Sequence, residues 1–143
     1  MVQRLVSVTL CINSEQISPE FWTGYFGVEP DYLGHKGEAL LTPSGRLASG
    51  GGRLNSWVVT SHQHVESISL NDHIAYVIER LNLPRADLTS VLTKNLSTLL
   101  CFYSWNNGTG EPRPALLTTL LKKLAQSGIK LEDGMTLAQE TNP

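Results

Sequence analysis

One stretch, residues 53–83, constrains the fold of this chain more than any other. Its first part, residues 53–61, is rich in β-branched and aromatic residues and predicts a strand. After a polar connection the pattern becomes helical, with one row of apolar side chains: Leu70, Ile74, Val77, Ile78 and Leu81. Such a row has to be buried against another element. The stretch therefore predicts a strand followed by a helix that packs on a sheet.

Four further segments have strand character. Residues 4–13 alternate apolar and polar side chains, as expected of a strand with one buried face. Residues 96–105 carry apolar side chains on both faces, which indicates a strand in the middle of a sheet. Shorter strands are predicted at 36–41 and 129–131.

Capping residues mark the remaining helices. A helix at 18–27 is predicted to start at a serine-proline pair and to end at a left-handed glycine. Residues 87–94 predict one or two helical turns. Pro112 and Pro114 open a last helix that ends at Gly128 and has its own apolar row: Leu116, Leu117, Leu120, Leu121 and Leu124.

Together these elements predict an α+β fold. We expect a single-layer, mostly antiparallel sheet with amphipathic helices packed on it, in the approximate order β-α-β-β-α-β-α-β. The 143 residues suffice for one domain with one core, placed at 1–132 and followed by a polar tail at 133–143. The segments 10–12 and 100–102 are each followed by a polar loop and a helix, so an internal duplication of a β-loop-α unit stays open.

Charge and cysteine content exclude several classes of protein. A net charge of −2 argues against nucleic acid or an anionic membrane as partner. No apolar run approaches the roughly 20 residues of a membrane span, and the N-terminus lacks the pattern of a signal peptide, so we expect a cytoplasmic protein. Cys11 and Cys101 lack the Cys-x-x-Cys spacing of redox motifs and are interpreted as buried thiols.

The first helix contains much of the aromatic content of the chain. Phe21, Trp22, Tyr25 and Phe26 lie within six residues, and core packing against the sheet is the favoured interpretation. The alternative is a binding surface. Trp22 and Tyr25 are then the candidates, because tryptophan and tyrosine anchor many interfaces.

A glycine-rich segment at 42–52 has the composition of a loop. It is interpreted either as a lid over a site or as a flexible connection between strands. Arg46 and Arg53 are its candidate anion contacts. It is not a phosphate-binding loop, because no Gly-Lys-Ser/Thr follows and the next element is a strand.

His62 and His64 are the residues closest to a metal-site pattern. They lie two residues apart just beyond a predicted strand, so both imidazoles can project from one face. A third ligand is not evident, and we predict no metal. The sequence has no Gly-x-Ser-x-Gly motif and no carboxylates paired for acid-base catalysis. It therefore predicts no catalytic residue and no cofactor.

The order of several short motifs resembles a known family. The motifs are Ile17-Ser18-Pro19-Glu20, Gly27-Val28-Glu29-Pro30, Lys36-Gly37-Glu38, Ser56-Trp57, the helix at 70–81 and the helix-turn-strand at 117–130. Across nearly the whole chain they resemble the bacterial domain of unknown function (DUF) family 4279. The resemblance implies a compact bacterial α+β protein and implies no catalytic residue. The glycine-rich segment and the two histidines are not part of the family pattern.

Two functions stand as hypotheses. The favoured one is a non-enzymatic module that binds another bacterial protein, as an immunity-like or regulatory partner, because the sequence consists of scaffold without a reactive set. The alternative is a small-ligand binder or metal-assisted enzyme that uses the surface of Arg53, Trp57, His62 and His64. Homodimerisation through the aromatic helix or a sheet edge stays open.

Overall fold

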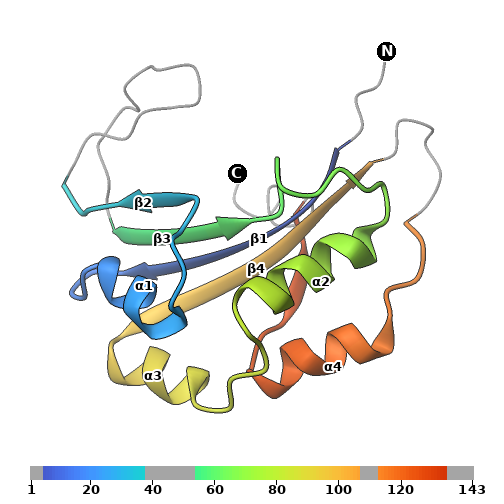
Figure 1. Ribbon diagram of the computed structural model, residues 1–143. Coiled ribbons are helices and arrows are strands. Elements are labelled where there is room, and N and C mark those ends of the chain that lie inside the picture. The colour runs from blue at the N-terminus through green and yellow to red at the C-terminus, as the bar shows by residue number, and fades with distance from the viewer. Residues whose placement is uncertain (1–4, 38–53, 107–112, 135–143) are drawn as a thin grey trace, which may run out of the picture.

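The computed structural model describes residues 5–37, 54–106 and 113–134 (Figure 1). Along the chain its elements are β1 (Leu5–Ser14), α1 (Glu20–Phe26), β2 (Tyr32–Gly34), β3 (Asn55–Thr60), α2 (Leu70–Arg80), α3 (Leu88–Lys94), β4 (Ser97–Asn106), α4 (Thr118–Gln126) and β5 (Leu131–Asp133). This arrangement confirms the predicted α+β class. None of the helices in the described ranges has the length and apolar character that a membrane span requires.

The strands form one mixed sheet in the order β2-β3-β1-β4-β5. β1 lies at its centre and pairs antiparallel with β4 from Leu5 to Ser14 and with β3 from Thr9 to Ser14. β2 also pairs antiparallel with β3, whereas β5 runs parallel to β4. The sheet is therefore mostly antiparallel, as predicted.

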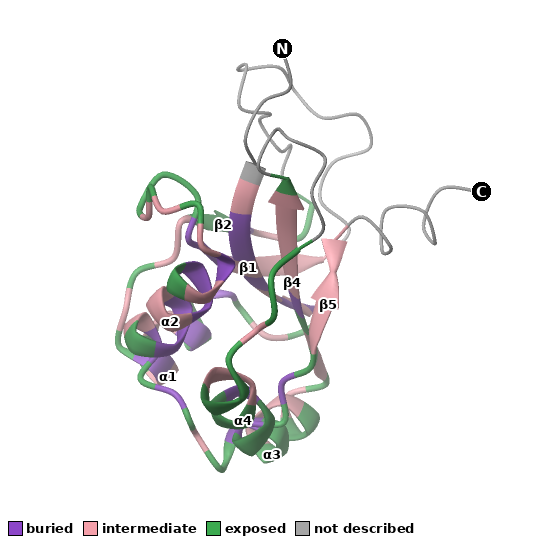
Figure 2. Cartoon of the chain, turned by 90° about the vertical axis from the view of Figure 1, so that its right-hand side faces the viewer, coloured by how far each residue is buried: buried purple, intermediate pink, exposed green. Residues whose placement is uncertain are grey.

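All four helices lie on the same face of the sheet (Figures 1 and 2). The pairing of Ile12 with Trp57 and of Leu10 with Val59 places these four side chains on that face, and all are buried. The predicted apolar row of α2 is also buried in full: Leu70, Ile74, Val77, Ile78 and Leu81. Each such side chain stabilises the fold by roughly 1.5–3 kcal/mol.

A buried polar network fixes α2 against the sheet. His73 Nε2–H donates to the carbonyl oxygen of Ser67 at 2.7 Å, and its Nδ1 accepts the hydroxyl of Ser61 at 2.7 Å. Ser61 Oγ also accepts the backbone N–H of Val8 at 2.8 Å. One hydroxyl therefore connects β1, the end of β3 and α2, and His73 is fully bonded in the core, because unpaired buried polar groups are costly.

Glycines end two helices as predicted. Gly27 follows α1 with a φ of 71°, and its N–H donates to the carbonyl of Thr23. After α4, Gly128 has a φ of 76°; its N–H donates to Ala125 O and that of Ile129 donates to Leu124 O, the pair of bonds of a Schellman motif. This turn directs the chain back to the sheet as β5.

Parts of the fold differ from the prediction. β2 at Tyr32–Gly34 was not predicted, and the strand expected at 36–41 falls largely on residues outside the described ranges. The last strand, expected at 129–131, is β5 at Leu131–Asp133. The last helix begins only at Thr118, because Asn71 holds the preceding segment extended: its side chain accepts the Leu117 N–H and donates to the Ala115 carbonyl. As a result Leu117, expected in the apolar row, is exposed.

Candidate functional site

The face of the sheet opposite α1, α2, α3 and α4 is covered by none of these four helices (Figures 1 and 2). We call it the open face. Strand pairing arranges its side chains in rows, because directly paired residues point to the same side. Three rows span four strands: Tyr32, Val58, Cys11 and Leu100; Thr60, Thr9, Phe102 and Glu132; and Gly34, Ser56, Asn13 and Thr98. A shorter row, Ser7 with Ser104, joins β1 and β4.

The open face is neutral over its three long strands. Its only charged row member, Glu132, comes from the edge strand β5, while β3, β1 and β4 contribute hydroxyl, amide, thiol and apolar side chains. Many of the polar groups bond to one another: Thr9 and Thr60 hydroxyls lie 3.0 Å apart, and Ser56 Oγ donates to Asn13 Oδ1 at 2.7 Å.

The first row is the apolar part of the open face. Tyr32 is 61% exposed and Leu100 37% exposed, with the half-buried Val58 and Cys11 between them. Burial raises the pKa of the Cys11 thiol, so the sulfur stays protonated at neutral pH and acts as a small apolar group. The row is therefore a continuous stripe of apolar surface across four strands.

A second candidate is a polar cluster centred on Asp31, at the edge of this face. Asp31 Oδ2 accepts hydrogen bonds from the backbone N–H of Thr60 at 2.8 Å and from Arg80 Nη1 at 2.7 Å, and its Oδ1 lies 2.7 Å from His64 Nε2. Arg80 Nη1 also donates to the hydroxyl of Tyr76. The His64 ring stacks on the Tyr76 ring, with 5.5 Å between the ring centroids. Both carboxylate oxygens are thus engaged.

Hydrogen bonds stabilise the ionised form of Asp31. Partial burial by itself raises the pKa of the carboxyl group, but the hydrogen bonds from Thr60, Arg80 and His64 outweigh it and hold the pKa below the ordinary value of 3.8. Asp31 is therefore ionised at neutral pH. Because Arg80 Nη2 donates to the Glu29 carbonyl at 2.7 Å, the cluster clamps the segment before β2 to the end of α2.

The clamp borders a shallow hollow of about 210 Å³. Asp31, Tyr32, Thr60, His62, Gln63 and His64 line it. The two histidines predicted to share a face thus line one hollow, but only His64 has a carboxylate partner there. Gln63 adopts a φ of 72°, a conformation that non-glycine residues rarely take, and this turn is what directs both histidines toward the hollow.

Two predicted contact residues belong to the core instead. Trp22 and Trp57 are 1% and 0% exposed, which corrects their assignment to a binding surface. Trp57 Nε1 donates to Thr23 Oγ1 at 3.0 Å, and the Phe26 ring stacks on Trp57 at 5.1 Å. Trp57 shares its side of the sheet with Ile12, so the aromatic helix α1 covers it. The core interpretation of the aromatic helix holds for these side chains.

Tyr25 is half-buried and serves a structural contact. Its hydroxyl donates to Asp87 Oδ1 at 2.6 Å, and the guanidinium of Arg85 lies 5.0 Å from its ring centroid. Burial, together with the neighbouring Asp87 carboxylate, raises the pKa of Tyr25 to about 12. Tyr25 therefore links α1 to the segment before α3.

The other candidates do not converge on the hollow. His35 bonds to Glu20 near the start of α1. Arg46, Arg53 and the whole glycine-rich segment lie outside the described residues. Among the residues that are described, no three His, Cys, Asp or Glu side chains are grouped as metal ligands.

Sequence reasoning missed Asp31, Tyr76 and Arg80. Tyr76 and Arg80 are spaced i, i+4 on α2 and so lie on one face of the helix, which was a usable signal. Asp31 offered none, because it lies 49 residues from Arg80 and belongs to no periodic element.

The sequence model of one family, described as a domain of unknown function (DUF4279), matches residues 4–134 and so covers nearly the whole chain. Comparison with curated proteins and with solved structures gives no match.

Proposed function

Because the chain belongs to the DUF4279 family, whose function is unknown, we propose its function from its own surface. The protein is a non-enzymatic module that binds a second bacterial protein through the open face of its sheet. The observation that carries this proposal is the neutral open face with its exposed apolar row of Tyr32, Val58, Cys11 and Leu100.

The distribution of charge supports this assignment. The centres of protein–protein interfaces are depleted of charged residues and enriched in aromatic ones. The long strands of the open face follow that composition, whereas the helices on the other side expose charged residues such as Asp72, Glu79, Lys122 and Lys123. A partner that docks on the open face would desolvate hydroxyls that are already bonded to each other, such as those of Thr9 and Thr60, at little cost.

The size of the open face sets the expected affinity. Strands of these lengths, spaced about 4.8 Å apart and rising about 3.3 Å per residue, give a flat area on the order of 500 Å². A standard interface buries about 800 Å² on each partner. We therefore expect a small interface to a flat, uncharged surface, with a dissociation constant on the order of micromolar rather than nanomolar.

A charge placed in the apolar row tests the proposal. Val58→Lys puts an ammonium group at the centre of the open face, and Thr119→Lys adds the same charge to an exposed position of α4 as the matched control. A partner is isolated with the wild-type protein, identified, produced in pure form and titrated against all three proteins by calorimetry. Val58→Lys should weaken binding at least about tenfold, because the lysine must be desolvated at the interface.

Equal binding by Val58→Lys and Thr119→Lys would exclude the open face as the site. Circular dichroism and thermal melting of both variants check that each is folded before it is titrated. Light scattering of the wild-type protein alone shows whether the bound surface is a second copy of the chain. A dimer that Val58→Lys dissociates would assign the open face to self-association and contradict a heterologous partner.

A further inference from the structure

The pairing of β4 is incomplete on one side. β4 pairs with β1 along its whole length, but with β5 only from Cys101 to Tyr103. Among the described residues, 97–100 therefore have no strand neighbour on the β5 side. Alternate residues of a strand direct their N–H and C=O groups to opposite edges, so half of the backbone groups of 97–100 face outward. We call this edge and the space beside it the β4 notch.

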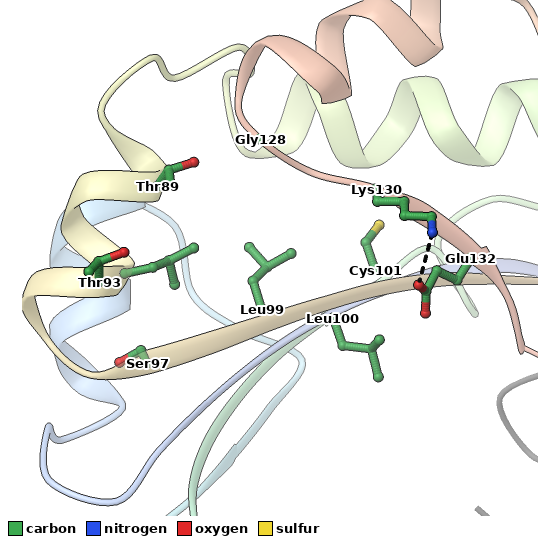
Figure 3. A pocket seen from close by; sticks show the side chains of 10 residues that line it. Thr89, Thr93, Ser97, Leu99, Leu100, Cys101, Gly128, Lys130 and Glu132 are labelled. Carbon is green, nitrogen blue, oxygen red and sulfur yellow. Dashed lines mark ion pairs between the residues drawn. The ribbon is translucent and has the colours of Figure 1, made fainter. Parts of the chain in front are cut away.

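A hollow of about 300 Å³ occupies the β4 notch (Figure 3). Figure 3 shows Leu99 and Cys101 pointing from β4 into this space, whereas Leu100 points to the opposite side of the strand. The hydroxyl groups of Thr89 and Thr93 come from α3 on one side. The notch therefore has an apolar floor beside a wall that can form hydrogen bonds.

The opposite wall is the segment that leads into β5. It includes Gly128, Lys130 and Glu132. A side chain at Gly128 would collide with the hydroxyl of Thr89, so α3 and this segment are in close contact on the side of the hollow away from β4, and the end near Ser97 is left open (Figure 3). β5 closes the other end from Leu131 onward, because it takes the position beside Cys101. The notch has room for the end of a chain rather than for a strand that continues past it.

The charged groups at this wall are loosely held. Lys130 Nζ lies 3.9 Å from Glu132 Oε1, and the Lys130 side chain is 87% exposed. Exposed ion pairs of this kind contribute about 0–1 kcal/mol, so Lys130 can exchange its partner for another carboxylate. Burial raises the pKa of Cys101 to about 12, which keeps the thiol neutral and makes it part of the apolar floor.

The geometry points to the β4 notch as a binding site for the C-terminal peptide of a partner protein. The peptide adds a short strand to β4, parallel to it and in line with β5, and its terminal carboxylate meets Lys130. An apolar side chain near its end lies on Leu99 and Cys101. Glu132 competes with the carboxylate for Lys130. Leu100 and Glu132 belong to both the β4 notch and the rim of the open face, but Val58 at the centre of that face does not line the notch. Val58→Lys therefore tests the proposed function without altering the notch, and the two can fail independently.

The test uses the full chain and an array of pentapeptides with free C-termini and randomised last three residues. The strongest binder is then measured by fluorescence anisotropy as the free acid and as the C-terminal amide. We expect the amide to bind about tenfold more weakly or worse, because it loses a charge-assisted hydrogen bond. Lys130→Gln should cause a similar loss, and Glu132→Gln should strengthen binding about threefold by removing the competing carboxylate.

Two control variants leave the β4 notch unchanged. Lys122→Gln removes one lysine from the exposed side of α4 and should leave binding unchanged, as should Val58→Lys on the open face. Amide signals of residues 97–100 should shift in nitrogen-15 NMR spectra on addition of the peptide. Equal binding of acid and amide, shifts confined to other residues, or an array without a binder would each overturn the inference.

Discussion

Removal of the Asp31 carboxylate should destabilise the protein by about 3 kcal/mol. Hydrogen bonds to charged groups contribute about 1.5–3 kcal/mol each, and the loss of one partner of a buried ion pair costs about 3–5 kcal/mol. Asp31 accepts three such bonds, while its side chain is 15% exposed and that of Arg80 18%. Arg80 keeps two other acceptors and water can reach the rest, so we take the lower end of the range for Asp31→Ala.

Urea unfolding at neutral pH, followed by circular dichroism, measures this loss. Asp31→Asn keeps the shape and one acceptor oxygen, so it should cost less, about 1–2 kcal/mol. Glu66→Ala is the matched control, because it removes one carboxylate from an exposed position two residues after His64 and should change stability by less than about 0.5 kcal/mol. A loss for Asp31→Ala no larger than that of the control would refute the description of this cluster as a clamp.

The pH dependence of the same variants provides a second check. The pKa of Asp31 is lower in the folded protein than its ordinary value of 3.8, so its stabilisation is fully present above that value. It is lost as the pH falls below 3.8 through the folded-state pKa. Asp31→Asn has no such contribution to lose. The gap in unfolding free energy between wild type and Asp31→Asn should therefore be constant from pH 7 to pH 5 and close in acid; a gap that widens in acid contradicts the assignment.

Other parts of the fold give equally direct expectations. Gly27→Ala and Gly128→Ala each place an alanine in the left-handed conformation, but only Gly128→Ala also drives a methyl group into α3. The loss of unfolding free energy should therefore be larger for Gly128→Ala by about 1 kcal/mol or more, and equal losses would contradict this packing. Ser61→Ala leaves the buried Val8 N–H and His73 Nδ1 without their partner, so it should lower the free energy of unfolding in urea by about 2 kcal/mol or more. The control Ser90→Ala, at an exposed position, should change it very little. Cys101, 1% exposed and with a pKa raised to about 12, should react with a thiol reagent only when the protein unfolds; rapid labelling of the folded protein would contradict the burial of this thiol.

Helices and strands with a regular spacing of apolar residues were predictable, because that spacing shows which face of the element is buried. The apolar row of α2 is buried at every predicted position, since the 3.6-residue period fixes one face of a helix whatever it packs against. β2 has only three residues, too few to show a period, and it was not predicted. The start of α4 depends on Asn71, a side chain 46 residues away, which no local pattern reveals.

The candidate sites were harder to predict because they depend on which strands are neighbours. His62 and His64 line one hollow, but through a turn after the end of β3, with Gln63 in a left-handed conformation, and not through the strand spacing from which their common face was predicted. Trp57 could point to either face of β3, and only the packing of α1 on that strand determines that it is buried. The open face follows from the register of β1 with β3 and β4, in which Val58 and Leu100 both pair with Cys11 from opposite sides. No spacing within one strand contains that information.

The central place of β1 has a consequence for how the protein is made. Its residues precede those of β4 in the chain, so the neighbours of β1, such as Cys101 beside Leu10, are synthesised about 90 residues later. At translation speeds of about 5–20 residues per second, this apolar segment waits on the order of 5–20 seconds without its main neighbour. Until then the nascent chain exposes Val8, Leu10 and Ile12 to other polypeptides. The order of synthesis therefore exposes an apolar segment to aggregation for a time that the stability of the finished fold does not determine.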